Sequence, residues 1–358
     1  MYFAPNIVII RHIRTREVGK NTRPGYFCTV DTKHKTQNME KYPHYLKRLQ
    51  DVTRKYWDKA ALNSIGGESF TYGQMATQIE KFHLVFEKLG IKKGEKIALW
   101  ARNGARWGMS YLAVNTYETV IVPLLADFTA DNAAFLVTHS ESIALFTNED
   151  KFKQMDIAKM PGVRFVVDVD TWGLLYARDA KDGDIYGEMD ALFAAKWPNG
   201  YGAEDVVFPT DNWDNLSTIN YTSGSTGDPK GVMLTYRNFC ANVDFSQRNV
   251  PAGDKMVSML PMAHMYGLVI EFIYPLCTGT AIYWLGKAPT PATLLKAFAD
   301  VKPYLLITVP LVMEKIYKSK IKPTLDKPLV KLLLKVPGVN QIIYKKVKDG
   351  LVQAFGGN

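Results

Sequence analysis

The sequence predicts an α/β protein built from layered parallel sheets. After Met39, short apolar runs alternate with segments of helical periodicity, which is typical of parallel strands joined by crossover helices. Hydrophobic residues make up 47% and charged residues 22% of the chain, as is usual for such a fold. Because 358 residues exceed one ordinary domain, we expect two α/β subdomains, at residues 39–210 and 211–358.

Each expected element follows from a local pattern. Short apolar runs predict strands at 96–100, 120–124, 143–146, 164–169, 216–220, 232–234, 255–260, 281–285 and 305–309. Longer segments with helical spacing predict helices at 105–117, 129–139, 236–248 and 291–300. Residues 171–215 lack clear periodicity, so we expect a loop-rich connector there.

The segment Tyr221–Gly231 is typical of a loop that wraps phosphates. It lies between two expected strands and contains three glycines, four hydroxyl side chains and one lysine. Glycines let backbone N–H groups approach an anion closely, and hydroxyl and ammonium groups add donors. The alternative is an exposed glycine-serine turn without a ligand. The lysine, the Asp228-Pro229 turn and the flanking strands favour phosphate binding.

A Walker A loop is a poor match to this segment. That motif requires a glycine, four residues, and then Gly-Lys-Ser/Thr. Here Gly224 and Gly227 are three residues apart, and Lys230 is followed by Gly231. A P-loop NTPase is therefore disfavoured.

Four segments together resemble the adenylate-forming superfamily, which comprises acyl-CoA synthetases, luciferases and the adenylation domains of peptide synthetases. Tyr221–Asn238 (YTSGSTGDPKGVMLTYRN) resembles its signature loop, and Glu68–Met75 its early strand-turn-helix element. Leu260–Leu268 resembles the Leu-Pro-x-x-His segment that borders the acyl pocket. Val301–Tyr317 is similar to a stretch typical of long-chain fatty acyl-CoA synthetases. The resemblance covers residues 39–358 and implies the layered parallel-sheet subdomains of the family's large N-terminal domain, truncated.

The resemblance implies an AMP-forming long-chain fatty acid–CoA ligase. In that reaction a fatty carboxylate attacks the α-phosphate of ATP, releasing pyrophosphate, and the thiol of coenzyme A then displaces AMP from the acyl-adenylate. ATP, Mg²⁺ and coenzyme A are the implied substrates and cofactors. The implied residues for the ATP phosphates are Thr222, Ser223, Gly224, Ser225, Thr226, Gly227 and Lys230. Lys230 and Thr226 are the implied catalytic residues, and Thr226 is the one expected to reach Mg²⁺.

The resemblance also assigns an acyl pocket to His264, Tyr266 and Gly267. A lone histidine among apolar residues is more often a core residue with one satisfied nitrogen. The position of His264 after Leu260-Pro261 matches the pocket-lining position of the family, which favours a role in orienting the substrate carboxylate. Gly267 is expected to leave room for an alkyl chain.

This sequence departs from the family by ending early. Members of the family continue well past the position matching Asn358, through an aromatic-Gly-x-Thr-Glu segment, a Thr-Gly-Asp motif, a hinge and a late lysine. The chain is therefore expected to be a fragment of the N-terminal domain. We expect it to be inactive or nearly so on its own, because the family's mobile domain separates the two half-reactions.

The positive charge is concentrated at the N-terminus. Of the formal net charge of +9, residues 1–38 contribute +5 and the remainder +4. The family pattern begins near Met39, so residues 1–38 are expected to be a disordered or spurious leader, with a nucleic-acid-binding arm as the disfavoured alternative. Cys28, Cys240 and Cys277 have neither metal-ligand nor disulfide spacing, which is typical of free thiols in the cytoplasm.

Two apolar segments bear on membrane contact. Met265–Leu285 is long enough to span a bilayer, but Pro275 and Gly279 divide it, so a buried helix followed by a core strand is expected. Ile343, Val347, Leu351 and Phe355 recur every four residues beside several lysines. The favoured interpretation is a solvated amphipathic helix. The alternative is a surface patch that contacts the inner membrane face and collects fatty acids.

Two further functions stay open. The chain can belong to an adenylating enzyme for another acid, such as an aryl or amino acid, although the aspartate usual in amino-acid activators is not seen after the strand preceding His264. It can also be a non-catalytic module that binds ATP or lipid. The small-molecule partners differ among these three functions, and nucleic acid is expected in none of them.

Overall fold

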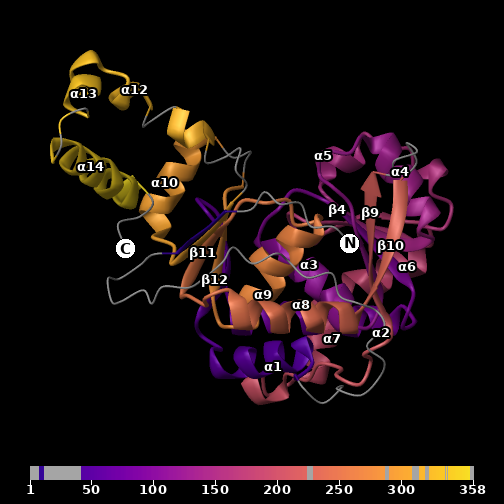
Figure 1. The fold of residues 1–358 in the computed structure, drawn as a ribbon. Coiled ribbons are helices and arrows are strands. Elements are labelled where there is room, and N and C mark those ends of the chain that lie inside the picture. Colours follow the sequence, from indigo (N-terminus) through magenta and orange to yellow (C-terminus); the bar gives the residue numbers. More distant parts are fainter. Residues whose placement is uncertain are drawn as a thin grey trace.

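The chain forms two sheets surrounded by helices (Figure 1). The computed structural model describes residues 8–11 and 42–354, apart from 224–228, 287–289, 309–313, 319–321, 335 and 337. Both sheets consist mainly of parallel strands, and each has antiparallel strands at its edges. The predicted fold class is confirmed.

The larger sheet has seven strands among the described residues, in the order β10-β9-β5-β4-β6-β7-β8. Its five central strands run parallel, and β10 and β8 lie antiparallel at the two edges. The bounds are β4 Lys96–Trp100, β5 Val120–Pro123, β6 Ser142–Thr147, β7 Phe165–Asp168, β8 Leu174–Ala177, β9 Leu216–Ser223 and β10 Pro229–Thr235. The strands expected in this region all form, within a few residues of their expected ends.

The second sheet has the order β1-β13-β11-β12-β2-β3 among the described residues. The strands β13, β11, β12 and β2 run parallel, and β1 and β3 lie antiparallel at the edges. The bounds are β1 Val8–Arg11, β2 Ala60–Ser64, β3 Ser69–Thr71, β11 Lys255–Ser258, β12 Ala281–Trp284 and β13 Leu305–Thr308. Each sheet takes strands from both sides of residue 210, and the division of the chain at that residue stays a prediction.

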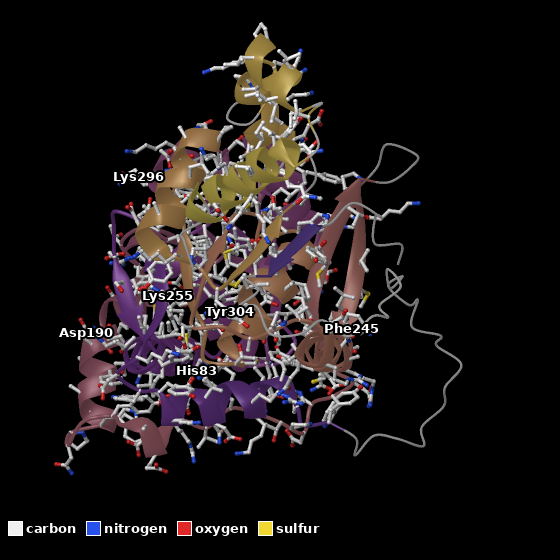
Figure 2. All side chains as sticks on the ribbon, turned by 60° about the vertical axis from the view of Figure 1, so that its left-hand side comes forward. His83, Asp190, Phe245, Lys255, Lys296 and Tyr304 are labelled. Carbon is white, nitrogen blue, oxygen red and sulfur yellow. The ribbon has the colours of Figure 1, made fainter. Side chains whose placement is uncertain are left out.

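Helices cover the faces of both sheets. In the first half they are α1 Tyr45–Lys55, α2 Tyr72–Lys88, α3 Ala105–Thr116, α4 Ala130–His139, α5 Glu149–Phe152, η1 Ile157–Lys159, α6 Ala180–Gly187, α7 Met189–Lys196 and η2 Ala203–Asp205. In the second half they are α8 Tyr236–Asn249, η3 Gly267–Ile273, α9 Tyr274–Leu276, α10 Pro291–Val301, α12 Lys322–Leu325, α13 Pro328–Leu333 and α14 Val339–Ala354. The last of these packs against α10, which carries the labelled Lys296 (Figure 2).

The two sheets share one hydrophobic core, and α3 lies within it. Leu62 of β2 and Ile97 of β4 belong to the same cluster of buried side chains. From Trp107 to Thr116 every residue of α3 is buried, which is typical of a helix covered on all sides. The expected helix at 105–117 is therefore the central layer of the fold.

The segment that begins with Glu68 forms the expected strand, turn and helix. The Thr71 hydroxyl accepts a hydrogen bond from the Gln74 N–H, and the Gln74 side chain accepts one from the Thr71 N–H, at 3.1 and 2.9 Å. This reciprocal pair is a capping box, which satisfies two N–H groups at the start of α2.

The expected connector at 171–215 is more regular than its sequence suggests. The strand β8 and the helices α6 and α7 lie within it. In the two helices, Tyr186 is the only buried residue, so neither carries the apolar stripe that helix prediction depends on. A loop-rich connector is therefore wrong for 174–196, where a strand and two short helices form.

The N-terminal leader contributes a strand. Residues 8–11 form β1, which pairs antiparallel with β13 through Val8 opposite Thr308 and Arg11 opposite Leu305. The rest of the leader lies outside the described residues. Residues 8–11 are therefore ordered, contrary to the expected disorder, which stays a prediction for the rest of the leader, as does the start at Met39.

Membrane-related expectations concern two parts of the chain. Residues 267–276 form the buried helical segment η3 and α9, and β12 follows as the expected core strand. Among the described helices, none has the length and apolar character needed to cross a bilayer. In α14, Ile343 and Val347 are half-buried while Lys345, Lys346 and Lys348 are exposed, as the amphipathic pattern predicts. Leu351 and Phe355 lie outside the described side chains.

Candidate functional site

The phosphate-type loop closes a hairpin at one edge of the larger sheet. The strands β9 and β10 pair antiparallel over their length, with Lys230 opposite Thr222 and Gly231 opposite Tyr221. Both Lys230 and Thr222 are exposed, so they lie side by side at the end of the hairpin where the loop begins. Gly224, Ser225, Thr226 and Gly227 lie outside the described residues, and of Ser223 only the backbone is described.

The base of this hairpin is fixed by bonds to helices. Tyr221 is buried, and its hydroxyl lies 2.7 Å from His139 Nδ1 at the end of α4. On the way into the loop, Thr218 bonds Tyr111 at 3.1 Å, and Ser217 accepts a hydrogen bond from the Asn115 amide at 2.8 Å. The strand therefore enters the loop from a rigid base, while Lys230 remains accessible to a ligand.

The second part of the site is the segment 259–266, which joins β11 to η3. His264 is exposed, and its Nδ1 accepts a hydrogen bond from the Tyr266 N–H at 3.3 Å. Neighbouring protein atoms partly desolvate the ring and lower the pKa of His264. The imidazole is therefore neutral at neutral pH and carries its proton on Nε2. It can donate a hydrogen bond to an anion, but it does not add a charge.

Tyr266 and Gly267 are both buried where η3 begins. Burial, with a smaller contribution from the nearby Glu271 carboxylate, raises the pKa of Tyr266 to about 12. At Gly267, a Cβ atom would lie 2.5 Å from the Pro261 carbonyl oxygen. Glycine at this position therefore lets the helix pack against the 260–261 backbone, and its expected role beside an alkyl chain stays a prediction.

We expect Gly267→Ala to lower the free energy of unfolding by about 1–3 kcal/mol, because the new methyl group displaces a backbone carbonyl. Urea unfolding of the parent and the variant measures this loss. Gly187→Ala is the matched control, since nothing lies within 4 Å of a Cβ built there. Equal losses in the two variants would contradict the close approach at Gly267.

Three polar side chains hold the segment 259–266 in place. The Asn220 amide of β9 donates to the Ala263 carbonyl at 2.6 Å. Asn103, which precedes α3, donates to the Leu260 carbonyl at 2.9 Å and accepts from the Met262 N–H at 3.2 Å. Glu271 of η3 accepts from the N–H groups of Met259 and Leu260. Through Asn220, the strand that leads into the phosphate-type loop is bonded directly to the segment that carries His264.

Sequence reasoning did not assign roles to these three residues. Asn220 is an amide at the end of an otherwise β-forming run, and Glu271 is the single charge within an apolar stretch. Both are unusual in such settings, since buried polar groups are expected to be paired. That anomaly is the signal in the sequence that could have found them.

Burial raises the pKa of Glu271 to about 7. The hydrogen bonds from Leu260, Ser258 and Met259 act in the opposite direction, but desolvation is the larger effect. Because the folded protein holds this proton more tightly than the unfolded chain, its contribution favours folding at low pH. That contribution is present below the ordinary pKa of about 4.5 and is lost as pH rises through about 7.

We expect this titration to appear as a difference between the parent and Glu271→Gln. Buried His44 and half-buried His83 act in the opposite sense. Desolvation lowers the pKa of each to about 4, so the stability that they contribute rises with pH up to about 6.5. Both variants share the histidines. The free energy of unfolding of the parent relative to Glu271→Gln should therefore fall between pH 5 and 8, by up to about 3 kcal/mol. Urea unfolding across this range measures it, and a difference that does not change with pH would contradict the raised pKa.

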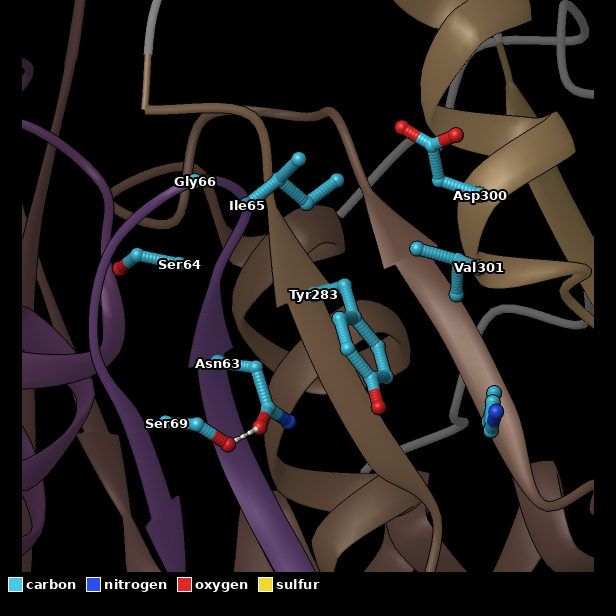
Figure 3. A pocket seen from close by; sticks show the side chains of 9 residues that line it. Asn63, Ser64, Ile65, Gly66, Ser69, Tyr283, Asp300 and Val301 are labelled. Carbon is cyan, nitrogen blue, oxygen red and sulfur yellow. Dashed lines mark hydrogen bonds between the residues drawn. The ribbon is translucent and has the colours of Figure 1, made fainter.

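A hollow elsewhere in the molecule contains none of the predicted site residues (Figure 3). It has a volume of about 300 Å³ and is lined by residues 63–66, Ser69, Lys255, Tyr283, Asp300 and Val301. Its polar groups are partly engaged within the protein: the Asn63 amide donates to the Ile282 carbonyl at 3.0 Å, and the Ser69 hydroxyl donates to Asn63. This hollow offers no arrangement that points to a particular ligand.

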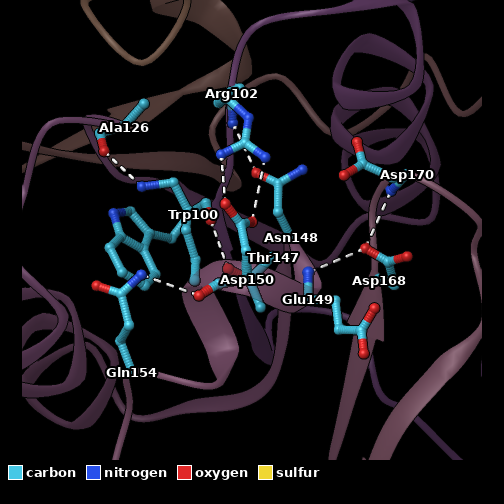
Figure 4. Close-up of polar contacts among 11 residues, drawn as sticks. Trp100, Arg102, Ala126, Thr147, Asn148, Glu149, Asp150, Gln154, Asp168 and Asp170 are labelled. Carbon is cyan, nitrogen blue, oxygen red and sulfur yellow. Dashed lines mark hydrogen bonds and ion pairs between the residues drawn. The ribbon is translucent and has the colours of Figure 1, made fainter.

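A polar network lies at the carboxyl ends of β4, β6 and β7 (Figure 4). Arg102 forms a two-bond ion pair with Asp150 at 2.9 and 3.1 Å, and its N–H donates to Asn148. Asp168 accepts from the N–H groups of Glu149 and Asp170 at 3.2 Å. Lys151 donates to the Ala126 carbonyl and lies 4.1 Å from the Trp100 ring centroid. These contacts join the loops that follow the strands, and both cations are engaged within the protein.

In the part of the chain that the structure describes, no three His, Cys, Asp or Glu side chains form a group that could hold a metal ion. Thr226, the residue expected to reach Mg²⁺, lies outside that part.

The fold is the layered α/β class that the sequence predicts. Residues 49–357 match the family described as AMP-binding enzyme, and the chain belongs to that family. The resemblance identified from the sequence is thereby confirmed.

Several curated relatives are named as acyl-CoA synthetases or ligases. The chain is 24% identical to long chain acyl-CoA synthetase 4 of Arabidopsis thaliana, over 80% of this chain and 46% of the relative. It is 28% identical to long-chain-fatty-acid–CoA ligase 5 of Rattus norvegicus, over 79% and 42% respectively. It is 30% identical to a chloroplastic long-chain-fatty-acid–[acyl-carrier-protein] ligase of Arabidopsis thaliana, over 76% and 39%. The chain spans less than half the length of each of these relatives.

Solved structures share the fold. The inhibitor-bound N-terminal domain of FACL13 from Mycobacterium tuberculosis superposes with a TM-score of 0.61 at 17% identity, covering 80% of this chain and 68% of that one. ATP-bound MatB from Rhodopseudomonas palustris superposes with a TM-score of 0.56 at 20% identity, covering 71% and 48%. These likenesses establish an adenylate-forming fold.

Proposed function

We propose that this chain is the N-terminal part of an AMP-forming long-chain fatty acid–CoA ligase. The observation that carries the proposal is the Asn220 bond to Ala263, which joins the strand entering the phosphate-type loop to the segment bearing His264. A ligase of this class must bring a nucleotide and a carboxylate together, and this bond couples the two regions expected to hold them. The names of the relatives supply the substrate class.

In the proposed reaction, a fatty carboxylate oxygen attacks the α-phosphorus of ATP and the bond to the β-phosphate oxygen breaks. Pyrophosphate leaves, and the thiol sulfur of coenzyme A later displaces AMP from the acyl carbon. The first step brings two anions together, so charge neutralisation and alignment should dominate catalysis. Lys230, which is exposed beside Thr222, is the residue proposed to stabilise the departing pyrophosphate. His264 is proposed to donate a hydrogen bond that orients the carboxylate.

Thr222, Ser223, Gly224, Ser225, Thr226 and Gly227 complete the proposed phosphate site, and Tyr266 and Gly267 the acyl site. MgATP is the proposed nucleotide substrate, with Thr226 contacting Mg²⁺. Coenzyme A is the proposed acceptor, and the whole activity is proposed for the full-length protein.

The test is acid-dependent exchange of pyrophosphate into ATP by the native full-length protein. We expect exchange with fatty acids of 14–18 carbons to exceed that with acetate, benzoate and amino acids by at least about 10-fold, because each buried methylene adds about 0.8 kcal/mol. Preferential exchange with an aryl or amino acid would favour a different adenylating enzyme. Nucleotide binding without exchange would favour a non-catalytic module.

One relative favours a second candidate for the acceptor of the acyl group. The chloroplastic ligase that transfers long-chain fatty acids to acyl carrier protein is 30% identical to this chain. Thioester formation with coenzyme A and with holo-acyl-carrier protein, measured side by side, separates the two acceptors. Faster transfer to the carrier protein would replace coenzyme A in the proposal.

We also propose that the C-terminal helices contact an anionic membrane surface at its cytoplasmic side. Leu329, Leu332, Ile342 and Tyr344 of α13 and α14 are each more than half exposed, at 67%, 63%, 58% and 57%. Residues 314–354 carry ten lysines and three acidic residues, which favours anionic lipid.

We expect the Leu329→Ser and Leu332→Ser double variant to bind phosphatidylglycerol vesicles at least about fivefold more weakly than the parent, because it removes two exposed apolar side chains that the proposed contact would bury in the lipid. Vesicle sedimentation measures this, and Val207→Ser, at a site 71% exposed, is the control. Equal binding by the parent and the double variant would contradict the contact.

A further inference from the structure

Glu271 is a carboxylate in an unusual position. It lies in η3, which is a π-helix, and its exposed fraction is 0%. Its neighbours Ile270 and Phe272 are buried apolar residues. A buried carboxylate costs stability unless it is fully paired, and π-helical turns occur frequently at functional sites.

One oxygen of this carboxylate makes all of its hydrogen bonds. Oε2 accepts from the Ser258 hydroxyl at 2.9 Å, the Met259 N–H at 2.9 Å and the Leu260 N–H at 2.8 Å. These three residues are consecutive, and they lie where β11 ends and the chain leaves the sheet. Oε1 is buried and has no hydrogen-bond partner among the described residues.

These hydrogen bonds hold the turn at residues 258–260 in place; they do not form an ion pair. A strand that leaves a sheet has N–H groups without ladder partners, and the single oxygen of Glu271 satisfies two of them. Among the described residues no cation pairs with this carboxylate, and its stabilising contacts are the directional hydrogen bonds from the turn. The turn leads directly into the segment with His264, whose backbone N–H donates to the Pro261 carbonyl at 3.0 Å.

We propose that Glu271 is a positioning residue for the acyl site. Its carboxylate fixes the turn at residues 258–260 and thereby the direction in which the next segment presents His264. Asn103 and Asn220 bond the same segment further along, so Glu271 supplies its fixed starting point. The part of this inference that concerns the substrate rests on the proposed function.

Three variants of the native full-length protein test this role. Glu271→Ala removes the acceptor. Glu271→Gln keeps one oxygen that can accept all three hydrogen bonds, and so should rescue the turn. Phe272→Leu is the control, because Phe272 points its buried ring at Trp107, Tyr111 and Trp284 and loses core packing without touching the turn.

We expect Glu271→Ala to raise the KM for fatty acid by about 10-fold while the KM for ATP stays near that of the parent. Glu271→Gln should lie close to the parent, and Phe272→Leu should change neither KM. A role limited to stability predicts instead that Glu271→Ala and Phe272→Leu behave alike, and that outcome overturns the proposal.

Two measurements do not depend on activity. Hydrogen exchange of the Met259 and Leu260 amides should be faster in Glu271→Ala than in Phe272→Leu. The NMR titration of His264 should move back toward its ordinary pKa in Glu271→Ala only, since a released segment exposes the ring. If the parent shows no exchange with any acid, the proposed function fails while these two measurements still decide the positioning role. Unchanged amides and an unchanged His264 titration overturn it.

Discussion

Replacing Lys230 with alanine is expected to slow acyl-adenylate formation by about 100-fold, the typical effect of removing one charge-stabilising donor from a transition state. Lys230 is exposed at the start of β10, opposite Thr222, so its ammonium group is open to a ligand. Negative charge builds up on pyrophosphate as it leaves, so the ammonium group contributes more in the transition state than in the bound ground state. Fatty-acid binding should change little.

Single-turnover formation of acyl-adenylate by the native full-length protein measures the loss, and calorimetry measures binding of fatty acid. Lys296→Ala is the matched control, since Lys296 is an exposed lysine of α10 that pairs with Asp300 (Figure 2). Lys230→Arg should recover part of the rate because it keeps the charge. If Lys230→Ala forms acyl-adenylate as fast as the parent, Lys230 has no part in the chemistry.

Replacing Trp107 with alanine is expected to lower the free energy of unfolding by about 3–5 kcal/mol. Its exposed fraction is 1%, and its ring stacks on Tyr111 with centroids 5.6 Å apart and meets the edge of Phe272 at 6.2 Å. These contacts join the central helix α3 to η3. The cavity would open at the centre of the core that both sheets share, where little can collapse into it.

Urea unfolding followed by circular dichroism measures this loss. The matched control is Trp197→Ala, because Trp197 is half-buried at the end of α7 and donates to Glu80 at 3.0 Å. We expect the control to lose less than half as much. A loss at Trp107 no larger than that at Trp197 would mean that α3 is not the centre of the core.

Most of the fold could be predicted because its strands and helices have strong local signals. The run 97–100 is apolar, and β4 forms at 96–100 with the expected bounds; Thr129 caps α4 as its side chain suggests. The pairing of the strands could not be predicted from the sequence. Nothing local in residues 60–64 indicates that they pair with 281–284, because that contact depends on the whole core. In α6 and α7 only one side chain is buried. The apolar face of each helix is therefore too narrow for the sequence pattern to indicate a helix.

Residues of the candidate site could be proposed from the sequence where they lie in one short segment. Residues that come together from distant segments could not. Lys230 and Thr222 follow from a single loop composition, and they lie opposite each other in the hairpin. The bonds of Asn220, Asn103 and Glu271 to the His264 segment join different elements, and a sequence does not show which backbone groups a side chain will meet. Thr226 and the centre of the loop lie outside the described residues, so their roles stay predictions.

The layout of the second sheet has a consequence for synthesis on the ribosome. Leu62 pairs with Ile282, 220 residues later, so β2 and its hairpin partner β3 emerge long before their third strand, β12, exists. At ordinary elongation rates this interval lasts about 10 to 40 seconds. During it the apolar side chains of Ala61 and Leu62, which end fully buried, face water or a chaperone. Strands β4, β5 and β6 lie within 52 residues of one another, from 96 to 147, and can associate while translation continues.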